Sequence, residues 1–187
     1  AGNGFFKMSW LQMEQGNVAT KYINGIRLNT ASIIDVSPMK NTITATNLTY
    51  RQDDTPTFDG TNDYLDLPND LGYTTEVSAL AWFKHYGAPS GNYHIIMGGP
   101  ELEMSIQSAG YLRVGVVQGS RYVSNHGSGL TDGNWHQVGF SFDGTTKTAY
   151  IDGESVGTQS VPAGTLSSSF SNRRIGRFGS STSYYAN

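Results

Sequence analysis

The chain has 187 residues, enough for one domain of ordinary size, and its formal net charge is −3. Only 14 % of its residues are charged and no run of Lys or Arg occurs, which argues against nucleic acid as a partner because phosphate contacts need clustered cations. Cys is absent, so disulfides and thiolate metal sites are excluded. No apolar stretch approaches the ~18 residues of a membrane-spanning helix.

Short strands are the secondary structure that the sequence predicts. Apolar positions alternate with polar ones instead of recurring at helical spacing, and clusters of Gly, Ser, Pro and Asx residues interrupt them. We therefore expect less than ~10 % helix, well below the usual third. The expected strands lie, in chain order, within residues 5–11, 26–50, 56–67, 77–85, 93–97, 102–107, 111–118, 121–124, 134–142 and 147–151.

The clearest pattern lies between residues 134 and 156. Apolar side chains occupy alternate positions from Val138 to Phe142, and Asp-Gly pairs follow at residues 143–144 and 152–153. Asp-Gly between alternating strands predicts a hairpin, because Gly adopts positive φ without steric cost. Two successive hairpins and many short strands predict an all-β fold, a two-sheet antiparallel jelly-roll sandwich. Its expected core includes Trp82, Phe83, Val138, Phe140, Phe142, Tyr150 and Ile151.

Four motifs give the chain a family likeness. They are residues 58–65 (FDGTNDYL), 135–144 (WHQVGFSFDG), 148–157 (TAYIDGESVG) and 174–177 (RIGR). In this order they resemble the laminin G-like domains of the concanavalin A-like superfamily, and the likeness covers about residues 22–187. It implies the concanavalin A-like lectin/glucanase fold, which hosts lectins, adhesion modules, glucanases and virion proteins, so function must be argued from sites. The closing strand of that family is missing, so either the chain is truncated or another segment completes the sheet.

A second likeness lies near the N-terminus. Residues 10–22 read WLQMEQGNVATKY. This run resembles the last strand and exit of carbohydrate-binding-type sandwich domains in tail and capsid-surface proteins of bacteriophages. It implies that residues 1–21 are the last strand and linker of a preceding β-sandwich domain. Residues 22–187 would then form the laminin G-like domain, without its closing strand.

A catalytic reading rests on one pair of carboxylates. Glu101 and Glu103 have the spacing that places two side chains on one face of a strand. Glucanases of this fold add a third acid three residues later, and that position is Ile106. Glycosidases need paired carboxylates around the scissile bond, so we expect the chain not to be an enzyme and both Glu side chains to face solvent.

Between the two metals considered, the sequence favours calcium over zinc. Asp59, Asn62 and Asp63 supply oxygen ligands in one loop, the ligand type that calcium prefers. The laminin G likeness implies the same metal, since such domains often hold calcium at one rim. The alternative is that these side chains form Asx turns and bind no cofactor. The four His residues show no zinc-site spacing.

Two loops carry aromatic and polar side chains suited to sugar binding. Aromatic rings stack on sugar rings, while amide and imidazole groups bond to hydroxyls. The alternative is that the Tyr side chains only cover the core. The candidate glycan-binding residues are Tyr86, Tyr93 and His94 at the first loop, and Tyr122, Asn125 and His126 at the second.

These observations lead to one functional hypothesis and one alternative. The chain is expected to be a non-catalytic structural or attachment module of a bacteriophage virion, as a capsid decoration or tail appendage at the virion surface. Its expected partners are other virion chains, in an oligomeric assembly, and host-surface glycans. The alternative is a carbohydrate-binding module of a secreted bacterial enzyme or adhesin.

Overall fold

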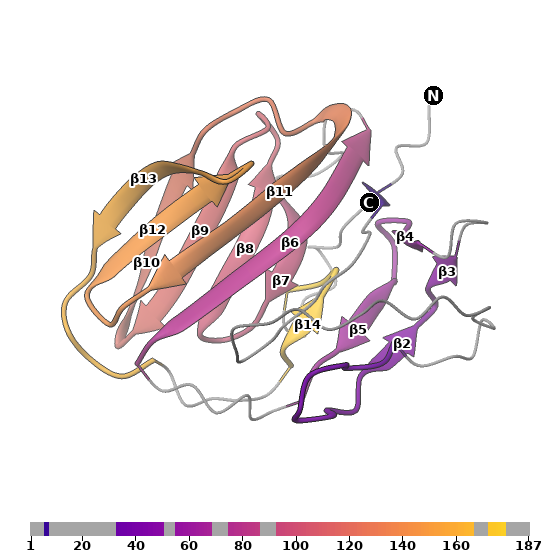
Figure 1. Ribbon diagram of the computed structural model, residues 1–187, viewed down its shortest axis with the longest axis horizontal. Helices are drawn as coiled ribbons and strands as arrows, with labels where there is room; N and C mark the ends of the chain where they lie inside the picture. The colour runs from indigo at the N-terminus through magenta and orange to yellow at the C-terminus, as the bar shows by residue number, and fades with distance from the viewer. Residues whose placement is uncertain are drawn as a thin grey trace.

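The protein is a β-sandwich. The structure, a computed structural model, describes residues 6–7, 33–50, 55–68, 75–86, 93–166 and 172–178. Every regular element in these ranges is a strand, and the strands form two layers packed face to face (Figure 1). All strand pairs are antiparallel, which confirms the all-β two-sheet fold. Within the same ranges no helix is long and apolar enough to cross a membrane.

Each sheet has seven strands within the described ranges. The first sheet has the order β13 (Glu154–Ser160), β12 (Thr146–Ile151), β11 (Asp132–Phe142), β6 (Val77–Tyr86), β1 (Phe6–Lys7), β4 (Pro56–Phe58) and β3 (Thr49–Tyr50). The second sheet has the order β10 (Ser120–His126), β9 (Leu112–Gln118), β8 (Leu102–Gln107), β7 (Tyr93–Gly98), β14 (Arg174–Ile175), β5 (Tyr64–Asp66) and β2 (Thr44–Thr46).

The two predicted hairpins are confirmed. β11 pairs with β12, with Val138 opposite Ile151, and β12 pairs with β13. The first turn uses Gly144 at φ 94°, a conformation that is free of strain only for Gly. The side chain of Asp143 fixes this turn, because its Oδ1 accepts hydrogen bonds from the backbone N–H groups of Thr145 and Thr146.

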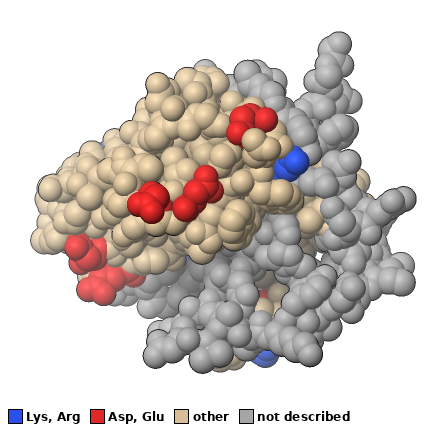
Figure 2. Space-filling model, turned by 45° about the horizontal axis from the view of Figure 1, so that its top comes forward, with Lys and Arg blue, Asp and Glu red and all other residues tan. Residues whose placement is uncertain are grey.

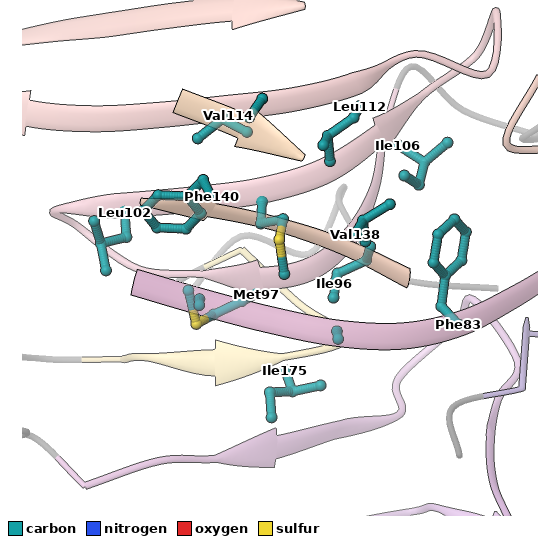
Figure 3. Packing of buried hydrophobic residues seen from close by; sticks show 14 of the residues in the cluster. Phe83, Ile96, Met97, Leu102, Ile106, Leu112, Val114, Val138, Phe140 and Ile175 are labelled. Carbon is teal, nitrogen blue, oxygen red and sulfur yellow. The ribbon is translucent and has the colours of Figure 1, made fainter. Parts of the chain in front are cut away.

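The core lies between the sheets and is formed by alternate residues of the long strands (Figure 3). Of the expected core residues, Phe83, Val138, Phe140 and Phe142 are buried, and Tyr150 and Ile151 are half-buried. The prediction for Trp82 is wrong, since that side chain is 42 % exposed. Successive side chains of a strand point to opposite faces, so the inward Phe83 directs its neighbour Trp82 outward.

The N-terminal strand β1 is part of the first sheet. β1 lies between β6 and β4 in the first sheet, with Phe6 opposite both His85 and Phe58. The backbone groups of these two residues complete the ladder between two strands of the sheet. Residues 8–32 and 179–187 lie outside the described ranges, so the domain boundary at residues 21 and 22 and the missing closing strand stay predictions.

Candidate functional site

The outer face of strands β7 to β10 gathers charged and polar side chains. In β8, Leu102, Met104 and Ile106 point into the core, so Glu103 and Ser105 lie on the opposite, outer face. The register places Arg113 of β9 opposite Ser105, and Asn125 of β10 opposite Arg113. We call this surface the β7–β10 outer face and define it by Tyr93, Glu103, Ser105, Arg113, Arg121 and Asn125.

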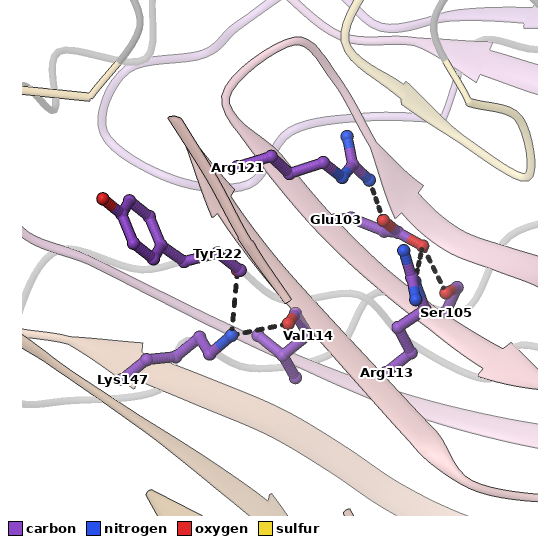
Figure 4. Close-up of polar contacts among 7 residues, drawn as sticks. All are labelled: Glu103, Ser105, Arg113, Val114, Arg121, Tyr122 and Lys147. Atoms are coloured by element: carbon purple, nitrogen blue, oxygen red, sulfur yellow. Dashed lines mark hydrogen bonds and ion pairs between the residues drawn. The ribbon is translucent and has the colours of Figure 1, made fainter. Parts of the chain in front are cut away.

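Glu103 is the centre of this face. Its side chain is 3 % exposed, and a carboxylate so deeply buried needs charged and hydrogen-bonding partners. Oε1 accepts hydrogen bonds from Arg113 Nε at 2.9 Å and from Ser105 Oγ at 2.8 Å. Oε2 accepts a hydrogen bond from Arg121 Nη2 (Figure 4). Two guanidinium groups therefore converge on one carboxylate.

Both guanidinium groups also stack on aromatic rings. Arg113 Cζ lies 4.6 Å from the centre of the Tyr93 ring, and Arg121 Cζ lies 4.9 Å from that of Phe178. The Arg113 side chain is 20 % exposed and that of Arg121 is 38 % exposed. These two groups are thus held in place on one side and open to solvent on the other.

A buried lysine lies beneath strands β9 and β10, which carry Arg113 and Arg121. Lys147 of β12 is fully buried, and its Nζ donates hydrogen bonds to the carbonyl oxygens of Val114, at 2.6 Å, and Tyr122, at 3.1 Å (Figure 4). Burial lowers the pKa of Lys147 to about 8. Arg113 lowers this pKa further, while Glu103 opposes the change. In the sequence, Lys147 occupies a core-facing position of an amphipathic strand, the one signal that could have identified it.

Two of the six candidate glycan-binding residues lie on the β7–β10 outer face. Tyr93 is half-buried beneath Arg113, and Asn125 is exposed on the strand beyond it. Arg113, which sequence reasoning missed, therefore lies between them. Tyr86 ends β6, and its side chain lies outside the described part of the chain.

The other three candidates point into the sandwich. His94 is buried, and its Nδ1 shares a hydrogen with His85 Nε2 at 2.8 Å. His126 is buried too, with Nε2 2.6 Å from Ser124 Oγ, and Tyr122 is half-buried against the core. The structure thus does not bring the six residues to one surface, and sugar contact by any of them stays a prediction.

The carboxylate pair considered for catalysis is buried. Glu101 and Glu103 are 1 % and 3 % exposed, so the expectation that they face solvent is wrong. The physical reason is ion pairing, because Glu103 pairs with two Arg side chains and Glu101 Oε1 accepts a hydrogen bond from the buried Arg173. Each carboxylate is therefore held by a guanidinium group.

The loop considered for calcium uses its carboxylates as acceptors of backbone hydrogen bonds. Asp63 Oδ2 accepts from the N–H of Asp59 at 2.8 Å, and Asp59 Oδ1 accepts from that of Thr61 at 2.7 Å. Asp63 is buried, and this burial raises its pKa to about 6. The exposed Asn62 accepts a 3.5 Å hydrogen bond from Asn47 through its backbone oxygen. The bond between Asp59 and Thr61 forms an Asx turn. No cluster of three acidic or His side chains in the described ranges is placed for a metal, so the calcium site stays a prediction.

The outer face of the first sheet carries an exposed apolar patch that sequence reasoning missed. Leu80 and Trp82 are its exposed members. Leu80 lies opposite Gly139 and Trp82 opposite Gln137 on β11. A Cβ on Gly139 would lie 2.7 Å from the carbonyl oxygen of Ala79 and 2.8 Å from Leu80 Cδ1, so a side chain at residue 139 would clash with β6.

The comparison with known families agrees with this architecture. The family described as the concanavalin A-like lectin/glucanases superfamily matches residues 59–186. The chain belongs to this superfamily. The matched residues contain all of β5 to β14, and so the whole β7–β10 outer face, whereas β1 to β4 precede them. The concanavalin A-like likeness seen in the four sequence motifs is thus confirmed.

Two solved structures are similar to this chain in fold. The binding domain of Paraclostridial Mosquitocidal Protein 1 has a TM-score of 0.64 and 10 % identity, over 81 % of this chain and 43 % of that one. Domain 4 of AbnA, an extracellular arabinanase from Geobacillus stearothermophilus solved with arabinotriose, has a TM-score of 0.53 and 15 % identity, over 79 % and 78 %. This chain therefore spans less than half of the mosquitocidal chain. No curated protein matches it in sequence.

Proposed function

We propose that this chain is a non-catalytic glycan-binding module, and that the β7–β10 outer face is its binding surface. The observation that carries the proposal is the position of Arg113, fixed by Tyr93 and Glu103 and followed by the exposed amide of Asn125. Planar guanidinium and amide groups bond to sugar hydroxyls, and groups already fixed in the free protein lose little conformational entropy on binding.

The buried carboxylates support a binding role over a hydrolytic one. A retaining or inverting glycosidase needs one carboxyl group to give a proton and a second to act as nucleophile or base beside the scissile bond. Glu101 and Glu103 instead serve as ion-pair partners of Arg173, Arg113 and Arg121. The superfamily's fold is compatible with either role, so the choice between binding and hydrolysis rests on the side chains of the site.

We extend the proposal to the setting of the module. The resemblance of residues 10–22 to bacteriophage sandwich domains supports a place at a virion surface, as a capsid decoration or tail appendage that contacts other virion chains and host glycans. The alternative is a carbohydrate-binding module of a secreted bacterial enzyme or adhesin. The arabinanase domain shows that this sandwich also occurs within an extracellular enzyme.

A glycan array tests the binding function. The full chain should bind a subset of bacterial surface glycans on the array. Asn125→Ala should weaken this binding, because the amide is exposed and lies on the proposed surface. Thr158→Ala is the matched control, since Thr158 is exposed on β13 of the other sheet. Equal losses in the two variants, or no retention of any glycan by the wild type, would contradict the proposal.

A separate experiment, on a culture of the bacterium and virus that produce the protein, tests whether the module belongs to a virion or to a secreted protein. Mass spectrometry of density-purified virus particles should find the full-length chain if it is a virion protein. Recovery only from the particle-free medium would favour the secreted alternative and would leave the glycan-binding proposal intact.

A further inference from the structure

Positive charge is concentrated on the β7–β10 outer face. Arg113 and Arg121 share a single carboxylate partner, Glu103, so this cluster has an excess of one positive charge. The whole chain has the opposite sign, with a formal net charge of −3. The cluster therefore differs in sign from the average charge of the molecule.

The exposed carboxylates lie elsewhere. Between residues 93 and 126, the span of β7 to β10, the only carboxylates are Glu101 and Glu103, and both are buried. Figure 2 shows exposed carboxylates scattered over the described surface. In the described ranges the side chain of Asp66 on β5 is 40 % exposed, and the exposed acidic residues are Asp59, Glu76, Asp132, Asp143, Asp152 and Glu154. The exposed carboxylates thus lie away from strands β7 to β10, and an approaching anion would be drawn to the β7–β10 outer face.

Both guanidinium groups have donors to spare. A guanidinium group offers five N–H donors, and in the described ranges Arg113 and Arg121 each give one to Glu103. The exposure of their side chains leaves other donors accessible from solvent. Guanidinium groups pair with carboxylate or sulfate oxygens through two parallel hydrogen bonds, and the hydroxyl groups of neutral sugars lack the negative charge that strengthens these bonds.

A third cation supports the same sign of potential. Lys147 bonds to the carbonyls of Val114 and Tyr122, which directly follow Arg113 and Arg121 in the chain. Burial is the main cause of its lowered pKa, and both Arg side chains contribute to it. Glu103 opposes this lowering, so Lys147 lies in the field of two guanidinium groups and one carboxylate.

We propose that the β7–β10 outer face selects anionic glycans, those that bear carboxylate or sulfate groups, with Arg113 and Arg121 as the anion-binding residues. This inference rests on the proposed glycan-binding function and adds the class of ligand. Asn125, opposite Arg113, supplies the amide for a neighbouring hydroxyl.

Titration calorimetry on the full chain tests this selectivity. Three soluble polymers serve as probes: polygalacturonate for carboxylate, dextran sulfate for sulfate, and dextran as the neutral reference. We expect one or both charged polymers to bind and dextran not to bind. Binding should weaken as NaCl is raised from about 50 to about 300 mM, because salt screens exposed charges. The two charged arms identify which anion the face prefers.

Two variants localise the effect. Arg121→Gln removes the more exposed guanidinium and should lower the affinity for the charged polymer about tenfold. Lys84→Gln is the charge-matched control, since it removes one cation from β6 on the other sheet, and it should change affinity less than about twofold. Arg113→Gln should act like Arg121→Gln, and circular dichroism checks that each variant is folded.

Each outcome has a defined meaning. Equal binding of dextran and the charged polymers, or an Arg121→Gln variant that binds charged polymers as the wild type does, overturns the anionic selectivity. In that case the glycan-binding proposal stands if the array still shows retention that depends on Asn125. If no polymer binds in calorimetry and no glycan on the array binds the protein, both the anionic selectivity and the glycan-binding function are overturned.

Discussion

His136 Nδ1 donates a 2.8 Å hydrogen bond to Asp152 Oδ2 and so ties β11 to the turn between β12 and β13. The second ring nitrogen, Nε2, lies 3.1 Å from Asp132 Oδ1. A ring that bonds to a carboxylate through each nitrogen donates from both, which favours the protonated imidazolium. The other oxygen of Asp152 accepts the backbone N–H of Gln137, which fixes the carboxylate.

We predict that His136 stabilises the fold most when it is protonated. Burial opposes its charge, but hydrogen bonds to Asp152 and Asp132 outweigh burial and raise its pKa above the ordinary 6.5. This stability is fully present below pH 6.5 and is lost as the pH rises through the raised pKa. NMR titration of the imidazole measures the pKa, and melts of the wild type and His136→Gln measure the stability. A pKa at or below 6.5 would contradict the prediction.

His126 supplies an internal control of opposite sign. Burial and the nearby Lys147 lower its pKa, so the folded state holds the ring neutral. Its contribution to stability is lost as the pH falls through 6.5, because the unfolded chain then takes up the proton. The two rings should therefore titrate on either side of 6.5 in one NMR experiment.

Asp63→Asn should stabilise the protein at neutral pH. The buried carboxyl has a pKa of about 6, so its favourable, protonated form is lost as the pH rises through that value. Asn keeps an oxygen for the Asp59 N–H and carries no charge, so we expect a gain of about 1–2 kcal/mol at pH 7 and little change at about pH 4. Melts with and without Ca²⁺ measure it. A loss of stability that appears only with Ca²⁺ would instead support the calcium site.

Val138→Asp should prevent folding. Val138 is fully buried between the sheets, and an unpaired charge there costs at least ~3–5 kcal/mol, a large part of the stability of a domain. Circular dichroism should show loss of the β spectrum or of the cooperative melt. Gln137→Asp, at the next position on the outer face, is the control and should fold. A folded Val138→Asp protein would show that the core is placed wrongly.

The buried pair of Glu101 and Arg173 should show strong coupling. Glu101→Gln leaves the Arg173 charge buried without its counter-ion, so we expect a loss of about 3 kcal/mol or more. The double variant Glu101→Gln with Arg173→Gln should lose less than the sum of the single losses, which denaturant titration measures. Additive losses would indicate that the pair contributes no interaction of its own.

Local patterns predicted part of this fold, because the information lay within a few residues. The Asp-Gly turns and the alternation around Phe140 define the β11–β12 hairpin without any distant partner. The segment of β6 is different, since Trp82 and Phe83 are both apolar and only the packed sheet shows which one faces inward. Apolar character alone does not specify a face when adjacent positions share it.

The candidate site could not be predicted in the same way, because its contacts join distant parts of the chain. Glu103 and Arg121 are 18 residues apart, and Glu101 and Arg173 are 72 residues apart. The register of several strands sets these pairings, and the sequence near each Glu carries no sign of them. From the sequence alone, Glu101 and Glu103 are therefore indistinguishable from ordinary solvent-facing residues. Only the neighbouring strands of the folded sheet show that they are paired and buried.

The position of β1 has a consequence for the order in which the chain folds. β1 precedes the other described strands in the chain, yet its residue Phe6 pairs with Phe58 and His85, more than 50 residues later. Until it docks, β6 and β4 each present an unpaired edge, the kind of edge that recruits other chains. Closing such long-range pairs is slow. We therefore expect the pairing of β1 with β6 and β4 to be the last step in assembling the first sheet. Aggregation of the growing chain should compete with folding at that step.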